Sequence, residues 1–261
     1  MREPLVVRGV TLGSGVPKVC VPLMGRDAQA LTRNAPAVRD SRPDVVEWRV
    51  DHLSDLSPEN LARCARIARS CAGNTPLLLT FRTKREGGER DLPPEDYAAL
   101  LTSLLALGVA DLLDVELFTG DAIVADLVRR AHTAGVAVIG SSHDFSATPE
   151  ESELTARLER MAALGCDVAK VAVMPQNSRD VLNLLSATER VHRAHPDLPL
   201  ITMSMGQLGL VSRLSGEVFD SCLTFGTAGQ ASAPGQAPVE DLRRHEGRER
   251  GRAEGHPGLY G

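Results

Sequence analysis

Eight short apolar runs, separated by polar or amphipathic stretches, constrain the fold of this chain more than any other feature. Runs rich in β-branched residues that alternate with helical periodicity are typical of parallel βα units. Eight such units make a (β/α)₈ barrel, and 261 residues is close to the ~250 residues usual for that fold. We therefore predict an α/β protein with a (β/α)₈ TIM barrel, its strands at Lys18–Met24, Val45–Asp51, Leu77–Thr83, Leu112–Phe118, Val136–Phe145, Val168–Pro175, Leu200–Met205 and Cys222–Gly226.

Three segments depart from the βα repeat. Leu5–Leu12, followed by Gly13-Ser-Gly15, predicts a β-hairpin that closes the floor of the barrel. Thr227–Pro238 is too weakly apolar for a helix and too long for an ordinary loop, so we expect a mobile lid. We expect a single domain over residues 1–242 and a charged, glycine-rich, poorly ordered tail over residues 243–261.

Two helix starts carry local signals. Ser57-Pro58 predicts an N-cap followed by a first-turn proline. Thr148-Pro149-Glu150-Glu151 predicts a capping box that begins at Thr148, and Gly165 is expected to end that helix.

Composition excludes several classes of function. A net charge of −5 provides no field that would attract nucleic acid or an anionic membrane. No stretch has the ~18 uninterrupted apolar residues of a membrane span, and the first residues do not resemble a signal peptide. The 5 cysteines include no Cys-x-x-Cys pair, so we interpret them as buried thiols in a reducing cytoplasm.

Lys170 interrupts the apolar run Cys166–Pro175, which is bounded by Gly165 and reads as a strand buried on both faces. Burial disfavours a charged ammonium, and a free amine is a nucleophile for carbonyl carbon. Alternatively, the lysine stem could follow the sheet and place its charge in water. This stretch alone leaves both interpretations open.

Charged side chains gather where the predicted strands end, which is where barrel enzymes carry their catalytic groups. Each has an ordinary structural explanation alone, such as an ion pair or a hydrogen-bonded histidine. Together they indicate a site, because each buried ion loses several kcal/mol of hydration. The candidates are Glu47, Arg49, Asp51, Arg82, Glu86, Asp114, Glu116, His143 and Lys170, with Arg213 downstream.

Several strings, in order from about Val6 to Leu242, together resemble type I 3-dehydroquinate dehydratase. They are Glu47-Trp-Arg-Val-Asp51, Thr80-Phe-Arg82, Glu86-Gly-Gly-Glu89, Asp114-Val-Glu-Leu-Phe-Thr-Gly120, Ser142-His-Asp-Phe145, Lys170-Val-Ala-Val-Met-Pro175, Ile201-Thr-Met-Ser-Met-Gly206, Ser212-Arg213 and Ala231-Ser-Ala-Pro-Gly-Gln236.

The resemblance implies a homodimeric barrel that converts 3-dehydroquinate to 3-dehydroshikimate in the shikimate pathway, with no metal or other cofactor. It implies that Lys170 forms an imine with the substrate ketone, that His143 is the general base and later acid, and that Glu86 orients His143. The remaining residues would bind substrate: Arg213 its carboxylate, Glu47, Arg49 and Arg82 its hydroxyls, and Ser232 and Gln236 from the lid.

Two positions depart from the family pattern. Cys20-Val-Pro22 has proline where some members have a serine, so that hydroxyl is missing. The sequence Asp241-Leu-Arg-Arg-His-Glu-Gly247 has little apolar surface, which predicts a short or loosely docked last helix.

Three other functions fit parts of the pattern. An imine-forming aldolase could use the same lysine, although the eighth strand lacks a compact phosphate-binding loop. Glu47, Asp51, Glu116 and His143 could bind a hard metal ion. A non-catalytic binding barrel could retain the site without turnover.

Overall fold

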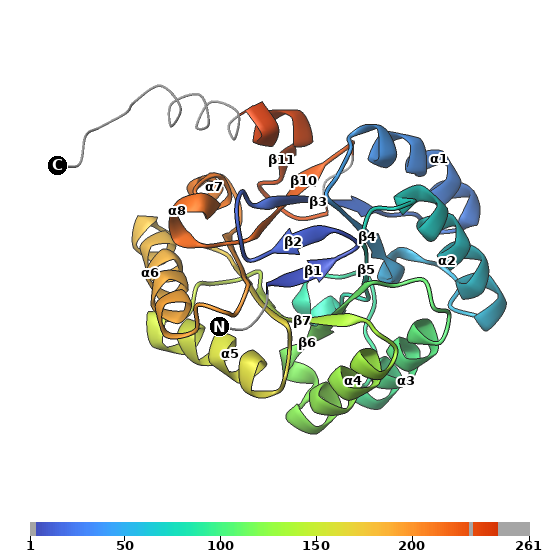
Figure 1. Cartoon of the computed structure of the whole chain (residues 1–261), viewed down its shortest axis with the longest axis horizontal. Helices are drawn as coiled ribbons and strands as arrows, with labels where there is room; N and C mark the ends of the chain where they lie inside the picture. Colours follow the sequence, from blue (N-terminus) through green and yellow to red (C-terminus); the bar gives the residue numbers. More distant parts are fainter. Residues whose placement is uncertain (1–3, 230–231, 245–261) are drawn as a thin grey trace.

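The computed structural model describes residues 4–229 and 232–244. Within them the predicted barrel is confirmed: parallel strands form a ring, and helices surround it (Figure 1). The barrel strands are β3 (Lys18–Leu23), β4 (Val45–Arg49), β5 (Leu77–Thr80), β6 (Leu112–Glu116), β7 (Ala137–Asp144), β8 (Val168–Val173), β9 (Leu200–Ser204) and β10 (Leu223–Thr227). The helices are α1 (Ala28–Asp40), α2 (Pro58–Ala72), α3 (Pro94–Leu105), α4 (Asp121–Thr133), α5 (Glu151–Ala163), α6 (Ser178–Ala194), α7 (Leu210–Leu214) and α8 (Gly216–Phe219).

Hydrogen bonds close the ring between its last and first strands. Strands β3 to β9 pair in chain order, and β10 pairs with β3. On the other side of β10, Leu200 of β9 forms a parallel bridge with Ser221, and the Cys222 N–H donates to the Leu200 carbonyl at 2.7 Å. No strand edge of the ring is therefore left open at this junction.

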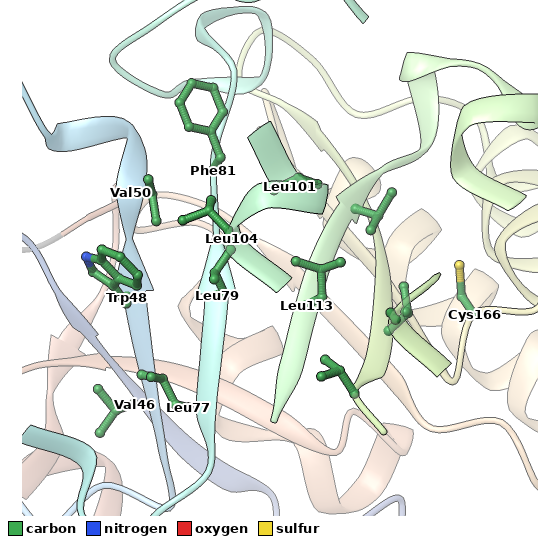
Figure 2. Close-up of a cluster of buried hydrophobic side chains, with 14 of the residues drawn as sticks. Val46, Trp48, Val50, Leu77, Leu79, Phe81, Leu101, Leu104, Leu113 and Cys166 are labelled. Carbon is green, nitrogen blue, oxygen red and sulfur yellow. The ribbon is translucent and has the colours of Figure 1, made fainter. Parts of the chain in front are cut away.

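The alternation of side chains along each strand divides the core into two layers. Outward side chains pack against the helices, and inward side chains near the start of the strands fill the barrel. Figure 2 shows part of the outer layer, with side chains of β4, β5 and α3: Val46, Trp48, Leu77, Leu79, Leu101 and Leu104. Every second residue of a strand points into the barrel. The polar residues nearer the carboxyl ends of the strands therefore point inward like the apolar residues that precede them.

The predicted hairpin consists of β1 (Leu5–Val7) and β2 (Val10–Leu12), and it crosses the centre of the ring (Figure 1). Arg8 and Gly9 turn the chain with φ of 45° and 79°, a left-handed turn suited to the twist of a hairpin. Val7 and Leu12 pack on the inner layer, which closes the barrel floor. Arg8 Nε also donates to Asp111 Oδ1 at 2.6 Å, which links the hairpin to the barrel.

The last described residues dock on the barrel. Strand β11 (Ala237–Pro238) pairs beside β10, and residues 239–244 are helical. Val239 and Leu242 are both buried in the outer layer, so the described part of this helix is packed despite its low apolar content. The predicted tail lies outside the described residues from residue 245 onwards, and the domain boundary at residue 242 stays a prediction.

The local signals were right for one helix and wrong for the other. Helix α2 begins at Pro58 with Ser57 at the N-cap position, but the Ser57 hydroxyl makes no capping hydrogen bond and donates to Asp55 Oδ2 at 2.8 Å. Helix α5 begins at Glu151 with Glu150 as its N-cap, so the capping box at Thr148 is wrong. The reason lies upstream, where Asp144 accepts hydrogen bonds from the Ser146 and Ala147 N–H groups and holds this loop outside the helix.

Helices α1 to α6 pack around the barrel as amphipathic segments, each with one buried face, whereas α7 and α8 leave Leu210, Val211 and Val218 exposed. None of the helices in the described part of the chain has the length and apolar character needed to cross a membrane.

We expect the hairpin to stabilise the barrel through Leu12, which is 1% exposed, and not through Val6, which is 56% exposed. Leu12→Ala should lower the free energy of unfolding by ~2–5 kcal/mol because it leaves a cavity in the floor. The matched change Val6→Ala should cost less than ~0.5 kcal/mol. Equilibrium urea denaturation measures both, and equal effects would show that the hairpin does not plug the barrel.

Candidate active site

A pocket opens at the carboxyl ends of the barrel strands, the end at which barrel enzymes carry out their chemistry. It is lined by Glu47, Arg49, Arg82, Glu86, Gly87, His143, Phe145, Lys170, Ala172, Met203, Met205, Phe225, Ser232, Ala233 and Gln236. Eight of the nine residues to which the family resemblance gives a role are among them, and the ninth, Arg213, contacts Met203 of the lining. The barrel therefore brings together residues that are far apart in the chain.

Lys170 lies inside the barrel, and its residue surface is only 3% exposed. The register pairs it with Ser141 of β7 and Ile201 of β9, so the pleat turns its side chain inward. Its Nζ lies 3.3 Å from Asp114 Oδ2 and 4.5 Å from the centroid of the Phe225 ring. The alternative in which this lysine reaches bulk water is excluded.

His143 and Glu86 form a hydrogen-bonded pair. The short helix Lys84–Glu86 follows β5 and brings Glu86 Oε2 to 2.9 Å from His143 Nδ1, while the same oxygen accepts the His143 backbone N–H at 3.0 Å. This contact occupies Nδ1 and leaves Nε2 as the ring nitrogen available to a ligand. The ring is therefore held in one orientation at the edge of the pocket.

Burial controls the protonation of this pair. It lowers the pKa of His143 well below the ordinary 6.5, and the positive charges of Arg82 and Lys170 lower it further. Burial also raises the pKa of Glu86 to about 8, and the nearby carboxylate of Glu116 contributes to the rise. The lowered pKa of His143 leaves its imidazole uncharged at neutral pH, and with Nδ1–H donating to Glu86 Oε2 the free Nε2 can accept a proton.

Arg82 is the centre of a buried ionic cluster below the pocket. Its guanidinium lies 2.7 Å from Asp114 Oδ1, 3.0 Å from Glu116 Oε1 and 3.5 Å from Glu86 Oε2. Burial alone would raise the pKa of Asp114, but Arg82 and Lys170 outweigh it and hold that pKa below its ordinary value. Most of the Arg82 hydrogen-bonding capacity is thus directed at the protein.

Glu47 and Arg49 point into the pocket from β4. Arg49 forms a fork on Asp51, with both N–H···O distances at 2.8 Å. Glu47 Oε1 accepts a hydrogen bond from Thr80 Oγ1 at 2.9 Å. These partners fix the two side chains but leave donors and acceptors that can reach a polar ligand.

Arg213 in α7 is a buried cation with weak partners. Its residue surface is 4% exposed, and its guanidinium contacts Met203 Sδ at 3.5 Å and the Pro234 carbonyl at 3.2 Å. Its Nε has no partner among the described residues. Burial lowers the pKa of this guanidinium to about 10 because no carboxylate in the described part of the chain compensates the charge. Such a cation is suited to bind an anion.

Ser232 and Gln236 lie on the segment predicted to be a lid. Gln236 Nε2 donates to Ser232 Oγ at 2.8 Å, and the Ser232 N–H donates to Gln236 Oε1 at 2.9 Å. The Gly206 N–H donates to the Pro234 carbonyl at 3.3 Å, which ties the segment to the end of β9. Both predicted lid residues therefore face the pocket, and lid mobility stays a prediction.

The candidate metal ligands are not brought together. Asp51 pairs with Arg49, Glu116 with Arg82, and His143 with Glu86. In residues 4–229 and 232–244, no group of three or more His, Cys, Asp or Glu side chains is arranged to hold a metal ion.

The contacts of Lys170 with Phe225 and Asp114 could not be predicted from the sequence. The pattern indicated Phe225 only as a strand end and Asp114 as a core salt bridge. Their contacts with Lys170 come from β10 and β6, and no spacing along the chain points to them.

The chain is similar along most of its length to proteins of one enzyme family. The family model of type I 3-dehydroquinase matches residues 19–245. A 3-dehydroquinate dehydratase of Escherichia coli strain K12 is 45% identical over 242 residues, which cover 92% of this chain and 96% of the relative. The crystal structure of a type I 3-dehydroquinate dehydratase from Clostridium difficile, with covalent modified comenic acid, is 41% identical with a TM-score of 0.92 and covers 97% of this chain and 100% of its own. A 3-dehydroquinate dehydratase from Geobacillus kaustophilus is 37% identical with a TM-score of 0.91, covering 95% and 97%.

The lowered pKa of His143 predicts a pH dependence of stability. Below pH 6.5 the unfolded chain takes up a proton at this imidazole and the folded chain does not, so this contribution is present above pH 6.5 and is lost as pH falls. His143 contributes a slope of up to about 1.4 kcal/mol per pH unit, whereas the raised pKa of Glu86 contributes a slope of opposite sign. His143→Gln should therefore change the net slope by the His143 contribution. Urea denaturation between neutral and mildly acidic pH measures the slope, and identical slopes in both proteins would contradict the burial of a neutral imidazole.

Proposed function

The chain belongs to the type I 3-dehydroquinase family, and on that premise we propose that it is a 3-dehydroquinate dehydratase of the shikimate pathway, which converts 3-dehydroquinate to 3-dehydroshikimate and water. One observation carries the proposal. The amine of Lys170 is buried in the pocket that the His143 and Glu86 pair also lines. A nucleophilic amine beside a fixed base is the arrangement that a dehydration next to a ketone requires.

The first step is the formation of an imine. A proton next to a ketone is too weakly acidic for a histidine near neutral pH, so the reaction needs an electron sink. The Lys170 ammonium first gives up one proton, and its Nζ then attacks the ketone carbon to form a C–N bond. That proton and one further N–H proton leave with the carbonyl oxygen as water, which gives the protonated imine. When the adjacent proton is removed, the electrons of that C–H bond move to the imine nitrogen and produce a neutral enamine.

His143 carries the proton between the two halves of the reaction. Its uncharged imidazole accepts the proton from the carbon next to the imine, and the same proton then assists the departure of the hydroxyl group as water. The enamine electrons expel that group and restore the protonated imine, which a water molecule hydrolyses to release 3-dehydroshikimate and the lysine. Glu86 keeps the ring in position through Nδ1.

The remaining polar groups account for binding of the substrate. Arg213, as a buried cation without a carboxylate partner in the described residues, takes the substrate carboxylate. Glu47 and Arg49 bind ring hydroxyls, and Ser232 with Gln236 covers the ligand from the lid. Arg82 lines the same pocket, but its contacts with Asp114 and Glu116 lead us to assign it chiefly to holding the ionic cluster.

We also propose that the protein works as a homodimer in the cytoplasm. All 5 cysteines are buried and free, as suits a reducing compartment. Large apolar side chains at the surface around α7 and α8, Leu208, Leu210, Val211 and Val218, are suited to an interface between copies. We expect light scattering of the eluting protein to give the mass of two chains, and the mass of one chain would contradict the dimer.

Reductive trapping tests the proposed chemistry, and the chain has only three lysines, at positions 18, 84 and 170. Borohydride added with 3-dehydroquinate should leave a mass increase on the Lys170 peptide. Lys170→Met should abolish the adduct, whereas Lys84→Met, at an exposed position near the site, should not. His143→Ala should still give the adduct while turnover falls roughly 10²–10⁴-fold.

A wild-type protein that turns over 3-dehydroquinate without an adduct on Lys170 would overturn the imine mechanism. A protein with neither turnover nor adduct would overturn the proposed activity and favour a binding barrel.

A further inference from the structure

Lys170 Nζ lies between two groups that favour positive charge, and they come from different strands. Asp114 of β6 places a carboxylate oxygen at 3.3 Å, and the face of the Phe225 ring, on β10, lies 4.5 Å from Nζ by its centroid. Asp114 is fully buried, and Phe225 is 5% exposed. Because water is largely excluded, both the ion pair and the cation–π contact act at close to full strength.

We propose that the ring face of Phe225 stabilises the positively charged Nζ of the protonated imine and so makes that imine the covalent species that accumulates. Asp114 provides the counter-ion. This inference rests on the proposed function, since it concerns an intermediate of that reaction. It goes further by assigning a chemical role to a side chain that otherwise counts as an apolar wall of the pocket.

The charge on Nζ at each step explains why such a site selects one intermediate. An ammonium and a ketone become a protonated imine and water, with one positive charge before and after. The carbinolamine between them, with a neutral amine nitrogen, and the enamine that follows loss of the α proton carry no charge on Nζ. The protonated imine is consumed either by addition of water to give the carbinolamine or by loss of the α proton to give the enamine. Both reactions remove the charge on Nζ that Phe225 and Asp114 stabilise, so the two residues lengthen the lifetime of the protonated imine.

Phe225 is the position at which this role can be isolated. Asp114 also pairs with Arg82, and substituting it would disturb the whole ionic cluster. The ring of Phe225 has no polar atom and can be altered electronically without a change of shape. Phe145 offers a matched control, because it lines the same pocket and packs near Gly87. Among the described residues, the cation–π contact of Lys170 is made with Phe225 and not with Phe145.

The test replaces Phe225 with mono-, di- and trifluorinated phenylalanine, which weaken the negative ring face stepwise. Each full-length protein is equilibrated with 3-dehydroshikimate, diluted rapidly, and quenched with borohydride after increasing times. Mass spectrometry then gives the decay rate of the adduct on Lys170. We expect this rate to rise with each fluorine, by about fivefold over the series, as loss of part of a desolvated cation–π interaction predicts.

The same series at Phe145 should leave the decay rate unchanged, and thermal unfolding of each protein controls for damage to the fold. A decay rate at position 225 that does not depend on the number of fluorines would overturn the role of the ring. Phe225→Leu, which keeps an apolar side chain and removes the ring, should decay at least as fast as the trifluorinated protein. If the unsubstituted protein gives no adduct at all, the imine mechanism fails, and with no turnover the proposed activity fails as well. Both outcomes differ from an adduct whose lifetime does not depend on the ring.

Discussion

The ionic cluster around Arg82 is the interaction on which the rest of the site depends. This one guanidinium contacts carboxyl groups from β6 and from the helix after β5. One of these groups, Asp114, also forms an ion pair with Lys170 of β8. Taking these ions out of water costs several kcal/mol for each, so they persist only because each meets an opposite charge. Burial raises the pKa of Glu86, and the neighbouring carboxylates of Glu116 and Asp114 raise it further, against the opposing effect of Arg82.

This balance also separates the functions of Arg82 and Arg213. Arg82 is surrounded by carboxyl groups and acts within the protein, which gives the lysine and the histidine fixed surroundings. Arg213 meets a thioether and a carbonyl group, so its charge is still available to a ligand. A site in which Arg82 is compensated and Arg213 is not can keep its shape and still bind an anion.

The closed barrel makes such a cluster possible. The outer layer of apolar residues packs on the helices and the hairpin seals the floor, so the interior is dry apart from the open end. In a dry interior a hydrogen bond to His143 and a ring face beside Lys170 have larger effects than they would at the surface. The chemistry of the site is therefore tuned by burial as much as by the choice of residues.

The amino-acid sequence by itself determined the fold class and the approximate strand positions, and a period of two along each strand decides which residues point inward. Glu47, Arg82, His143 and Lys170 could therefore be assigned to one pocket from their places along the chain. The partners of each side chain were decided only by the tertiary structure. Asp114, Phe225 and Lys170 come from three strands, and their distances follow from the register and closure of the ring. The start of α5 was likewise decided by the Asp144 side chain and not by the capping signal at Thr148, because local preferences of about 1 kcal/mol give way to the path of the surrounding loop.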